Sequence, residues 1–251
     1  MKVATWNVNG IRARHEQFVE WAASEQPDVI CLQEIKAKID QIPQTCSLEG
    51  YTCYWHGAGG YSGVGLHVRT EFAAKAEITH PDFDLETRIV QAQIEDTVFT
   101  SVYVPNGGKD FETKIAFIHS LIRYATDLRK QGLKLVLCGD MNIARTDMDV
   151  HPKERKRVIG QLPMERELLE RLISEGGLVD VGRSLYPDDD NYFSWWAPWR
   201  NMRQRNIGWR LDYVLATESL AGKAVSCPSQ REVGTSDHAP VVATFELAAS
   251  S

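Results

Sequence analysis

The segment LVLCGDMNIA (residues 135–144) joins a short apolar run to a polar end. A short apolar run that stops at a glycine is typical of a buried β-strand. Here the run stops at Gly139, and Asp140 and Asn142 follow at once. A carboxylate and a carboxamide next to a buried strand are unfavourable unless they find partners. The segment therefore predicts a strand that delivers polar groups to a functional site.

The segment PDVICLQE (27–34) has the same pattern earlier in the chain. Both segments follow a predicted helix, and both run an apolar strand into an acid, Glu34 in the first and Asp140 in the second. This similarity predicts two comparable halves, each of which brings one carboxylate to the same rim of the fold.

The rest of the chain consists mainly of short apolar runs separated by turn residues. A helical pattern over 163–175 begins at Pro163 and ends before Gly176 and Gly177, which are typical helix boundaries. Many strands with a few long helices indicate helices packed outside sheets. The predicted strands are 2–6, 28–33, 51–55, 62–68, 89–94, 98–104, 133–138, 210–216 and 239–246, and the predicted helices are 15–25, 111–130 and 163–175.

Length and composition indicate one domain spanning 1–251. The chain has 251 residues, of which 43% are hydrophobic and 25% charged, and a chain of this length can bury a full core. No apolar run approaches the roughly 18 residues of a membrane span. The start MKVATWNVNG turns polar at once, which argues against a signal peptide. We therefore expect a monomeric cytoplasmic protein without membrane contact.

The cysteines support a reducing compartment. There are five, an odd number, and no two are spaced as C-x-x-C, so a disulfide framework or a zinc site is not expected. Cys31 and Cys138 lie inside apolar runs and are predicted to be small core residues.

The overall charge hides two basic stretches. A formal net charge of −6 argues against nucleic-acid binding, because phosphate binders usually carry a basic surface. However, residues 151–166 hold five Lys or Arg against two Glu, and residues 199–210 hold four Arg and no acid. The second stretch interleaves Arg with Trp, which a merely solvated face does not need.

Acids and amides recur at the ends of predicted strands. Any one of them could be a turn residue. Together they would be unfavourable without a cation among them. Carboxylate and amide oxygens with few histidines and no cysteine suit Mg²⁺, or alternatively Mn²⁺, rather than zinc. These residues are Asn7, Asn9, Glu34, Asp140, Asn142, Asp212, Asp237 and His238.

A histidine and a tyrosine add groups that can exchange protons. His238 follows Asp237 directly, and histidine is the side chain most easily poised near neutral pH. A second carboxylate can fix its tautomer, and Asp212 is the candidate. Tyr103 ends a predicted strand before a Pro/Gly turn, where it either packs or hydrogen-bonds a phosphate or a leaving oxygen.

Together these motifs resemble the exonuclease III family of abasic-site (AP) endonucleases, within the endonuclease/exonuclease/phosphatase superfamily. The resemblance covers nearly the whole chain, and the motifs occur in family order. It implies an α/β, DNase I-like fold, a four-layer αββα sandwich of two mixed β-sheets flanked by helices. The segments that carry it are TWNVNGIRA (5–13), CLQEIK (31–36), YSGVGL (61–66), VYVPNGG (102–108), CGDMNIA (138–144), GWRLDYVLA (208–216) and SDHAPVV (236–242).

The resemblance implies Mg²⁺-dependent hydrolysis of the phosphodiester 5′ to an abasic site in duplex DNA, with 3′–5′ exonuclease and 3′-phosphatase activity. Asp140 would position or deprotonate the attacking water, with Asn142 beside it. His238, oriented by Asp212, would contact the scissile phosphate, and Tyr103 would serve the phosphate or the leaving group. Whether Asp140 or His238 is the base, and whether one or two metals act, stays open. The implied metal site draws on Asn7, Glu34, Asp140, Asn142, Asp237 and His238.

The resemblance also implies an apolar pocket for the baseless sugar, formed by Trp195, Trp209 and Leu211. Such a pocket would admit a bare deoxyribose and exclude a normal base, and a site without a base is cheap to extrude. Trp196 and Trp199 fit either the pocket or the core. The residues assigned to further DNA contacts are Asn9, Arg12, Asn106 and Lys109.

One segment departs from the family pattern. Relatives often carry an Asn-rich loop ending in Gly-Phe after the GDxN motif, whereas this chain has HPKERKRVIGQLP (151–163). Arg155 and Val158 stand at Asn positions, and Gln161 replaces Phe. The catalytic motifs are unaffected, but the departure leaves the DNA contacts and the balance of activities open.

Three other functions remain as alternatives. A phosphatase of the same superfamily would share the catalytic core, but the GWRLDY segment argues against it. A nonspecific DNase would typically be secreted and disulfide-bonded. A catalytically inactive DNA-binding protein would be expected to lack Glu34, Asp140 or His238, and all three are present.

Overall fold

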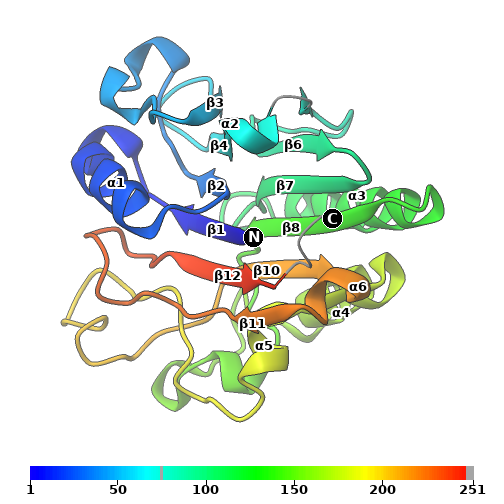
Figure 1. Cartoon of the computed structure of the whole chain (residues 1–251). Coiled ribbons are helices and arrows are strands. Elements are labelled where there is room, and N and C mark those ends of the chain that lie inside the picture. The colour runs from blue at the N-terminus through cyan, green and yellow to red at the C-terminus, as the bar shows by residue number, and fades with distance from the viewer. Residues whose placement is uncertain (74–75, 247–251) are drawn as a thin grey trace.

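Two six-stranded β-sheets pack face to face in the computed structural model, which describes residues 1–73 and 76–246 (Figure 1). Helices cover the outer faces of both sheets, so the predicted four-layer αββα sandwich is confirmed. The other residues of the predicted domain 1–251 lie outside the described residues.

The first sheet is built around the N-terminal strand, in the order β11-β12-β1-β2-β4-β3. β1 and β2 are parallel, and every other pair is antiparallel. Helix α1 (Ile11–Glu25) joins β1 to β2 and buries Phe18, Trp21 and Ala22 on the outer face of the sheet. The strands are β1 (Lys2–Asn7), β2 (Val29–Gln33), β3 (Tyr51–His56), β4 (Val64–Arg69), β11 (Ala224–Ser226) and β12 (Val241–Phe245).

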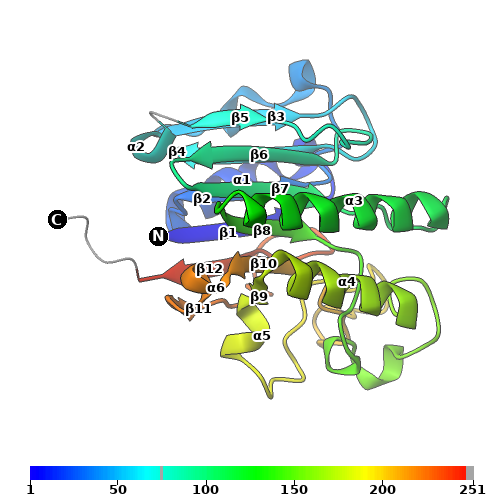
Figure 2. The same ribbon diagram turned by 90° about the vertical axis from the view of Figure 1, so that its right-hand side faces the viewer.

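The second sheet has the order β5-β6-β7-β8-β10-β9. Its parallel pair is β7 and β8, which α3 (Phe111–Lys130) connects. Figure 2 shows α3 and α4 (Pro163–Gly176) side by side on the outer face of this sheet. The strands are β5 (Glu77–Thr79), β6 (Ile89–Ile94), β7 (Thr97–Tyr103), β8 (Lys134–Asp140), β9 (Leu178–Asp180) and β10 (Asp212–Thr217).

The two sheets have the same topology. Each has a central parallel pair joined by a long helix, with two antiparallel strands on either side. β2 and β8 occupy equivalent places, and these are the strands that precede Glu34 and end in Asp140. The predicted pair of comparable halves is therefore confirmed.

Alternation along the strands divides the core into layers. Val29 and Cys31 of β2 face the space between the sheets, whereas Ile30 and Leu32 pack under α1. In β8 the outward residues, such as Leu137, pack under α3 and α4. The inner faces of both sheets therefore share one apolar layer, at whose end the polar site is built.

The predicted long elements are all present, and the boundaries differ by a few residues. α1 begins at Ile11 rather than at residue 15, directly after Gly10, whose φ of 101° suits a glycine. The described residues also contain elements too short to leave a periodic signal in the sequence. These are β5, β9 and β11, the helices α2 (Thr70–Ala73), α5 (Val181–Leu185) and α6 (Glu218–Ala221), and 3₁₀ turns at Ile39–Gln41, Gln44–Cys46, Asp147–Asp149 and Pro152–Glu154.

Among the helices of the described residues, none combines the length and the apolar character needed to cross a membrane.

Candidate active site

The polar site lies at one end of the space between the two sheets. Along β8, Val136 and Cys138 face this space, and the same alternation turns Asp140 toward it. Asp212 begins β10 directly opposite Asp140 in the antiparallel register. Asn7 ends β1 in the other sheet, and its Nδ2 lies 2.9 Å from Oδ2 of Asp140. The strand ends of both sheets therefore converge, as the sequence predicted.

A layer of neutral polar residues separates this site from the apolar core. Thr5 Oγ1 donates to Gln33 Oε1 at 3.0 Å, and Gln33 Nε2 donates to Ser101 Oγ at 3.1 Å. All three side chains are buried. Because these groups satisfy one another, the interior passes from apolar to charged without leaving an unpaired amide at the boundary.

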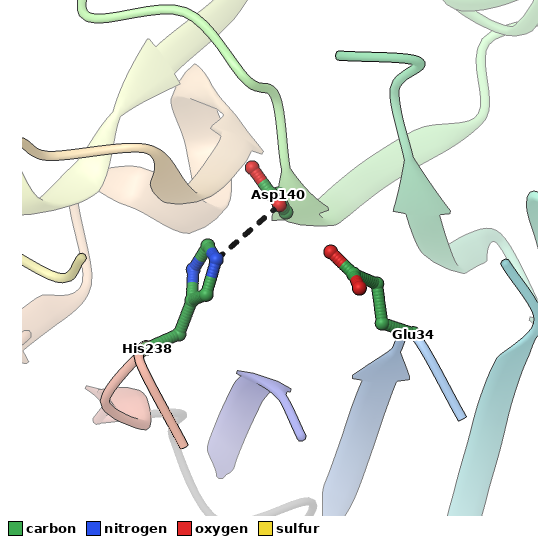
Figure 3. Close-up of side chains that lie close together, drawn as sticks. All are labelled: Glu34, Asp140 and His238. Atoms are coloured by element: carbon green, nitrogen blue, oxygen red, sulfur yellow. Dashed lines mark ion pairs between the residues drawn. The ribbon is translucent and has the colours of Figure 1, made fainter. Parts of the chain in front are cut away.

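Glu34, Asp140 and His238 form the centre of the site (Figure 3). One ligand atom from each lies within 4.8 Å of the others, and in the described part of the chain no other group of His, Cys, Asp or Glu meets this criterion. Nε2 of His238 is 3.7 Å from Oδ2 of Asp140. Asn7 Nδ2 also donates to Oε1 of Glu34 at 3.0 Å, so one amide joins the two carboxylates.

The carboxyl group of Asp140 has a raised pKa and therefore binds a proton more readily than an ordinary aspartate. Its side chain is fully buried, and burial together with the negative charges of Asp212 and Glu34 raises its pKa to about 7. The charge of His238 and a hydrogen bond from the backbone N–H of Asn142, at 2.8 Å, act in the opposite direction. Asp140 can therefore accept a proton near neutral pH.

Glu34 is held in the ionised form. Burial opposes its ionisation, but hydrogen bonds from Asn7 and Lys36 outweigh this effect and lower its pKa. Lys36 Nζ lies 2.5 Å from Oε2 of Glu34 and 2.6 Å from Oδ1 of Asn9. Sequence reasoning missed Lys36, although it closes the CLQEIK motif two positions after Glu34.

His238 is oriented by Asp212, as the sequence predicted. Its Nδ1 lies 2.8 Å from Oδ2 of Asp212, which leaves Nε2 facing Asp140. Burial alone would lower the pKa of His238, but the charges of Asp212 and Asp140 raise it to about 10. The imidazole is therefore a protonated donor at neutral pH.

Asp237 stands beside the central cluster and is engaged through both oxygens. Asn9 Nδ2 donates to Oδ1 at 2.8 Å, and Trp195 Nε1 donates to Oδ2 at 3.0 Å. Burial opposes its ionisation, but the neighbouring His238 and these hydrogen bonds lower its pKa. Asp237 thus ties the aromatic wall of the site to the residues that follow β1.

Tyr103 and Asn142 line the cavity of the site. Burial and the nearby Glu34 carboxylate raise the pKa of Tyr103 far above its usual range, so its phenol stays a neutral donor. The guanidinium of Arg88 lies 4.7 Å from the centre of the Tyr103 ring. Asn142 has a left-handed backbone with φ of 50°, and its Nδ2 donates to the carbonyl of Val104 at 2.9 Å.

A cavity of about 350 Å³ opens onto these groups. The rings of Trp195 and Trp209 meet edge to face in its wall, with centres 5.4 Å apart. Ile159 and Gly160 also line the cavity, and sequence reasoning missed both. They belong to the loop 151–163, which differs from the family pattern. The predicted site residues that line the cavity are Glu34, Tyr103, Asn106, Asn142, Trp195, Trp209, Leu211, Asp237 and His238.

Some predicted residues lie elsewhere. Arg12 and Lys109 are exposed and do not line the cavity, and Asn9 is connected to it through Asp237 and through Lys36. Of the two tryptophans left open by the sequence, Trp196 is 1% exposed and belongs to a small core cluster, whereas Trp199 is 59% exposed.

Gln161, which stands where the family pattern has Phe, does not line the cavity. Its side chain instead forms hydrogen bonds within the loop 151–163. Its Oε1 accepts from the backbone N–H of Lys156 and its Nε2 donates to the carbonyl of Glu154, both at 3.0 Å.

The donor set fits a hard divalent cation. The carboxylates of Glu34 and Asp140 converge, and a buried oxygen of Asp212 has no hydrogen-bond partner in the described residues. Oxygen-rich sites of this kind suit Mg²⁺ or Mn²⁺. A cation placed here would offset the concentrated negative charge.

A family model described as the endonuclease/exonuclease/phosphatase family matches residues 4–238. The exodeoxyribonuclease of Bacillus subtilis (strain 168) is 35% identical over 250 residues, which cover 96% of this chain and 98% of that protein. The chain belongs to the exonuclease III branch of this family. The resemblance seen in the motifs is thereby confirmed.

Solved structures of this family share the whole architecture. An AP endonuclease from Archaeoglobus fulgidus superposes with a TM-score of 0.88 at 28% identity, covering 98% of this chain and 100% of that one. The 3′ phosphatase NExo from Neisseria, bound to a product DNA hairpin, gives 0.88 at 29% identity with the same coverage.

Proposed function

We propose that this protein is a Mg²⁺-dependent DNA repair nuclease that hydrolyses the phosphodiester 5′ to abasic sites in duplex DNA and also processes 3′ ends. The observation that carries the proposal is the Glu34–Asp140–His238 cluster, in which Asp140 and His238 are buried, beside a cavity of about 350 Å³ with two tryptophans in its wall. The cluster supplies hydrolytic chemistry, and the cavity supplies a place for an extruded sugar. We further propose that it acts as a monomer in the cytoplasm.

The central residues have distinct roles in this mechanism. Glu34 would hold the metal from the first sheet while Asp140 faces it from the second, and Asn7 fixes the distance between the two carboxylates. When bound, Mg²⁺ polarises the phosphoryl group and stabilises charge on the leaving oxygen. Asp140, whose pKa is raised to about 7, accepts the proton of the attacking water.

The donors around the cluster stabilise the transition state. Protonated His238 donates from Nε2 to a non-bridging phosphate oxygen, and Asp212 keeps the ring in that orientation. The neutral phenol of Tyr103 donates to the leaving oxygen. No covalent nucleophile is required, because water attacks directly.

The aromatic wall supplies selectivity. Trp195, Trp209 and Leu211 surround a space that a deoxyribose without its base can enter. A normal nucleotide must unstack and then fit its base into the same space, so it is disfavoured twice.

The relatives support a DNA substrate. Their names describe an exodeoxyribonuclease, an AP endonuclease and a 3′ phosphatase bound to a DNA hairpin. All three activities hydrolyse phosphate esters of DNA, so one catalytic centre can serve them. The relative rates of the three activities then depend on how the DNA substrate binds to the cavity and to the loop 151–163.

The test uses four labelled duplexes. One carries a single abasic-site analogue, the second is intact with a recessed 3′ end, the third ends in a 3′-phosphate, and the fourth is intact and blunt-ended. Each is incubated with Mg²⁺ and with EDTA, and the D140N variant serves as the inactive control. We expect Mg²⁺-dependent cutting at the abasic site, with weaker 3′ trimming.

The other outcomes separate the alternatives. Release of the 3′-phosphate without cutting at the abasic site would make the protein a 3′ phosphatase. Internal cutting of the blunt duplex would make it a nonspecific DNase. Retention of DNA without cleavage in either buffer would identify a binding protein and overturn the proposal.

A further inference from the structure

A buried ion pair joins α3 to α4 beside the active-site cavity. Nζ of Lys114 lies 2.5 Å from Oε1 of Glu165, and both side chains are 0% exposed. A buried ion pair is weak support for stability, because desolvation of the two charges offsets their attraction. Joining the two helices therefore does not by itself account for a buried ion pair at this position.

Lys114 is bonded to two active-site loops as well as to Glu165. Its Nζ donates to the carbonyl of Asn142 at 2.8 Å and to that of Asn106 at 3.3 Å. Asn142 follows β8, Asn106 follows β7, and both line the cavity. Two of the three N–H donors of the ammonium group therefore serve the cavity wall, while its charge pairs with Glu165.

Glu165 holds a third loop. Its Oε2 accepts hydrogen bonds from the backbone N–H of Gly160 at 2.7 Å and of Leu162 at 3.1 Å. Ile159 and Gly160 in this loop line the cavity. The loop belongs to the segment 151–163 that departs from the family pattern, so the pair anchors the part of the wall that distinguishes this chain.

The fit of this loop against the pocket is close. Gly160 has a left-handed backbone with φ of 88°, and a Cβ added there would lie 3.1 Å from the Trp209 ring and 3.2 Å from the carbonyl oxygen of Asn142. A small shift of the loop would therefore move the tryptophan or open a gap beside it. The width of the pocket depends on where Glu165 places Gly160.

We propose that Lys114 and Glu165 are positioning residues that together hold the three loops lining the cavity, and so set the selectivity for abasic sites over normal nucleotides. The inference rests on the proposed function for its substrate. Neither residue contacts the substrate; both act through backbone groups of the cavity wall. The polarity of the pair matters, because only a donor fits at residue 114 and only an acceptor at residue 165.

The main test uses the neutral double variant K114M/E165Q beside the single variant K114M. The glutamine keeps an acceptor for the loop, and the double variant leaves no buried charge unpaired, so it is expected to fold even where K114M does not. The readouts are the ratio of kcat/KM for abasic-site cutting to that for 3′ trimming, and the indole ¹⁵N–¹H resonance of Trp209, assigned with W209F.

We expect the activity ratio to fall about 10- to 100-fold, because misplacement of a binding wall by about 1 Å has effects of this size. We also expect the Trp209 resonance to shift. The matched control is K130M, which removes an exposed lysine of the same helix that pairs with Asp127 at 3.1 Å. It should change neither readout.

A charge reversal separates positioning from simple attraction. In K114E/E165K the two charges still attract, but residue 114 can no longer donate to the carbonyls and residue 165 can no longer accept from the loop N–H groups. We expect no recovery of the activity ratio. Recovery would overturn the inference, and so would a double variant that lowers the melting temperature while both readouts stay unchanged.

Failure of the proposed function would be seen in the wild-type protein and can be distinguished from failure of the positioning claim. If the wild-type protein cut none of the duplexes, the activity ratio would be undefined, and the proposed function would fall together with the claim about selectivity. The Trp209 resonance would still decide the positioning claim: a shift in K114M/E165Q would support it, and an unchanged resonance would overturn it.

Discussion

The two sheets have the same strand order and direction, yet the carboxyl groups that they bring to the site have pKa values shifted in opposite directions. Glu34 follows β2 of the first sheet and has a lowered pKa. Asp140 ends β8, the equivalent strand of the second sheet, and its pKa is raised to about 7. Topology thus places the two acids alike, and their surroundings give them different chemistry.

The difference has a local cause. Glu34 keeps 15% of its side chain exposed and has Lys36 at 2.5 Å. Asp140 is fully buried and faces the negative charges of Asp212 and Glu34. A permanently ionised group suits a metal ligand, whereas a group that titrates near neutral pH suits a base. A repeated architecture thus carries two acids with different protonation, which supports the separate roles proposed for them.

The largest expected effect is that of D140N. Removing the group that accepts the proton should lower kcat for abasic-site cutting about 10³-fold, and excess Mg²⁺ should not restore it. Single-turnover cleavage at saturating enzyme measures the effect. The control is D96N, which alters an exposed acid paired with Lys134 in the same sheet. A loss of less than tenfold for D140N would remove the distinction between the two acids.

E34Q should lower metal affinity about 100-fold while leaving the chemical step largely intact. Its cleavage should therefore recover as Mg²⁺ is raised, unlike that of D140N. Titration of Mn²⁺ by electron paramagnetic resonance measures the affinity directly. Unchanged Mn²⁺ affinity in E34Q would mean that the metal does not depend on the first sheet.

Metal affinity should depend on pH through Asp140 and not through Glu34. Below pH 7 Asp140 gains a proton and loses the negative charge that attracts a cation held by Glu34, so Kd should rise by at most about tenfold for each pH unit below 7. Glu34, with its lowered pKa, stays ionised over this range. Calorimetric titration between about pH 5.5 and 8 measures the slope. The slope should vanish in D140N and persist in E34Q; the reverse pattern would exchange the two roles.

The smallest expected effect is that of K36M. Lys36 lies 34% exposed and pairs with Oε2 of Glu34, so in the proposed site it would compete with a cation for that oxygen. A partly exposed pair is worth at most about 1 kcal/mol, so its removal should tighten Mn²⁺ binding by at most about fivefold. The same Mn²⁺ titration serves as the measurement, with K38M as the control. Weaker binding in K36M would show that the lysine organises the site instead of competing for it.

Much of the site could be predicted because its residues end strands. Glu34, Asp140 and Asp212 each stand at the border of an apolar run, and alternation along a strand then decides which face they share. Asp237 and His238 were found as an adjacent acid and histidine between a loop and the last predicted strand, and the family resemblance then supplied their expected roles. Residues with these signals are visible in a single sequence.

Other features carry no such signal. Trp196 and Trp199 lie three positions apart in one short segment, and only tertiary packing makes the first buried and the second exposed. Lys114 and Glu165 lie on amphipathic helices, where charged residues normally face solvent. Their burial depends on loops that approach from elsewhere in the chain, so periodicity could not reveal it.

The pairing of β1 with β12 bears on when this protein can first cut DNA during its synthesis. β1 precedes every other strand of the described chain, yet one of its two neighbours is β12, the last of these strands. Asp237 and His238 immediately precede that strand. A nascent chain therefore carries Asn7 and Glu34 long before it acquires the imidazole, and β1 keeps an open edge until then. The nuclease centre is completed only as translation nears residue 245.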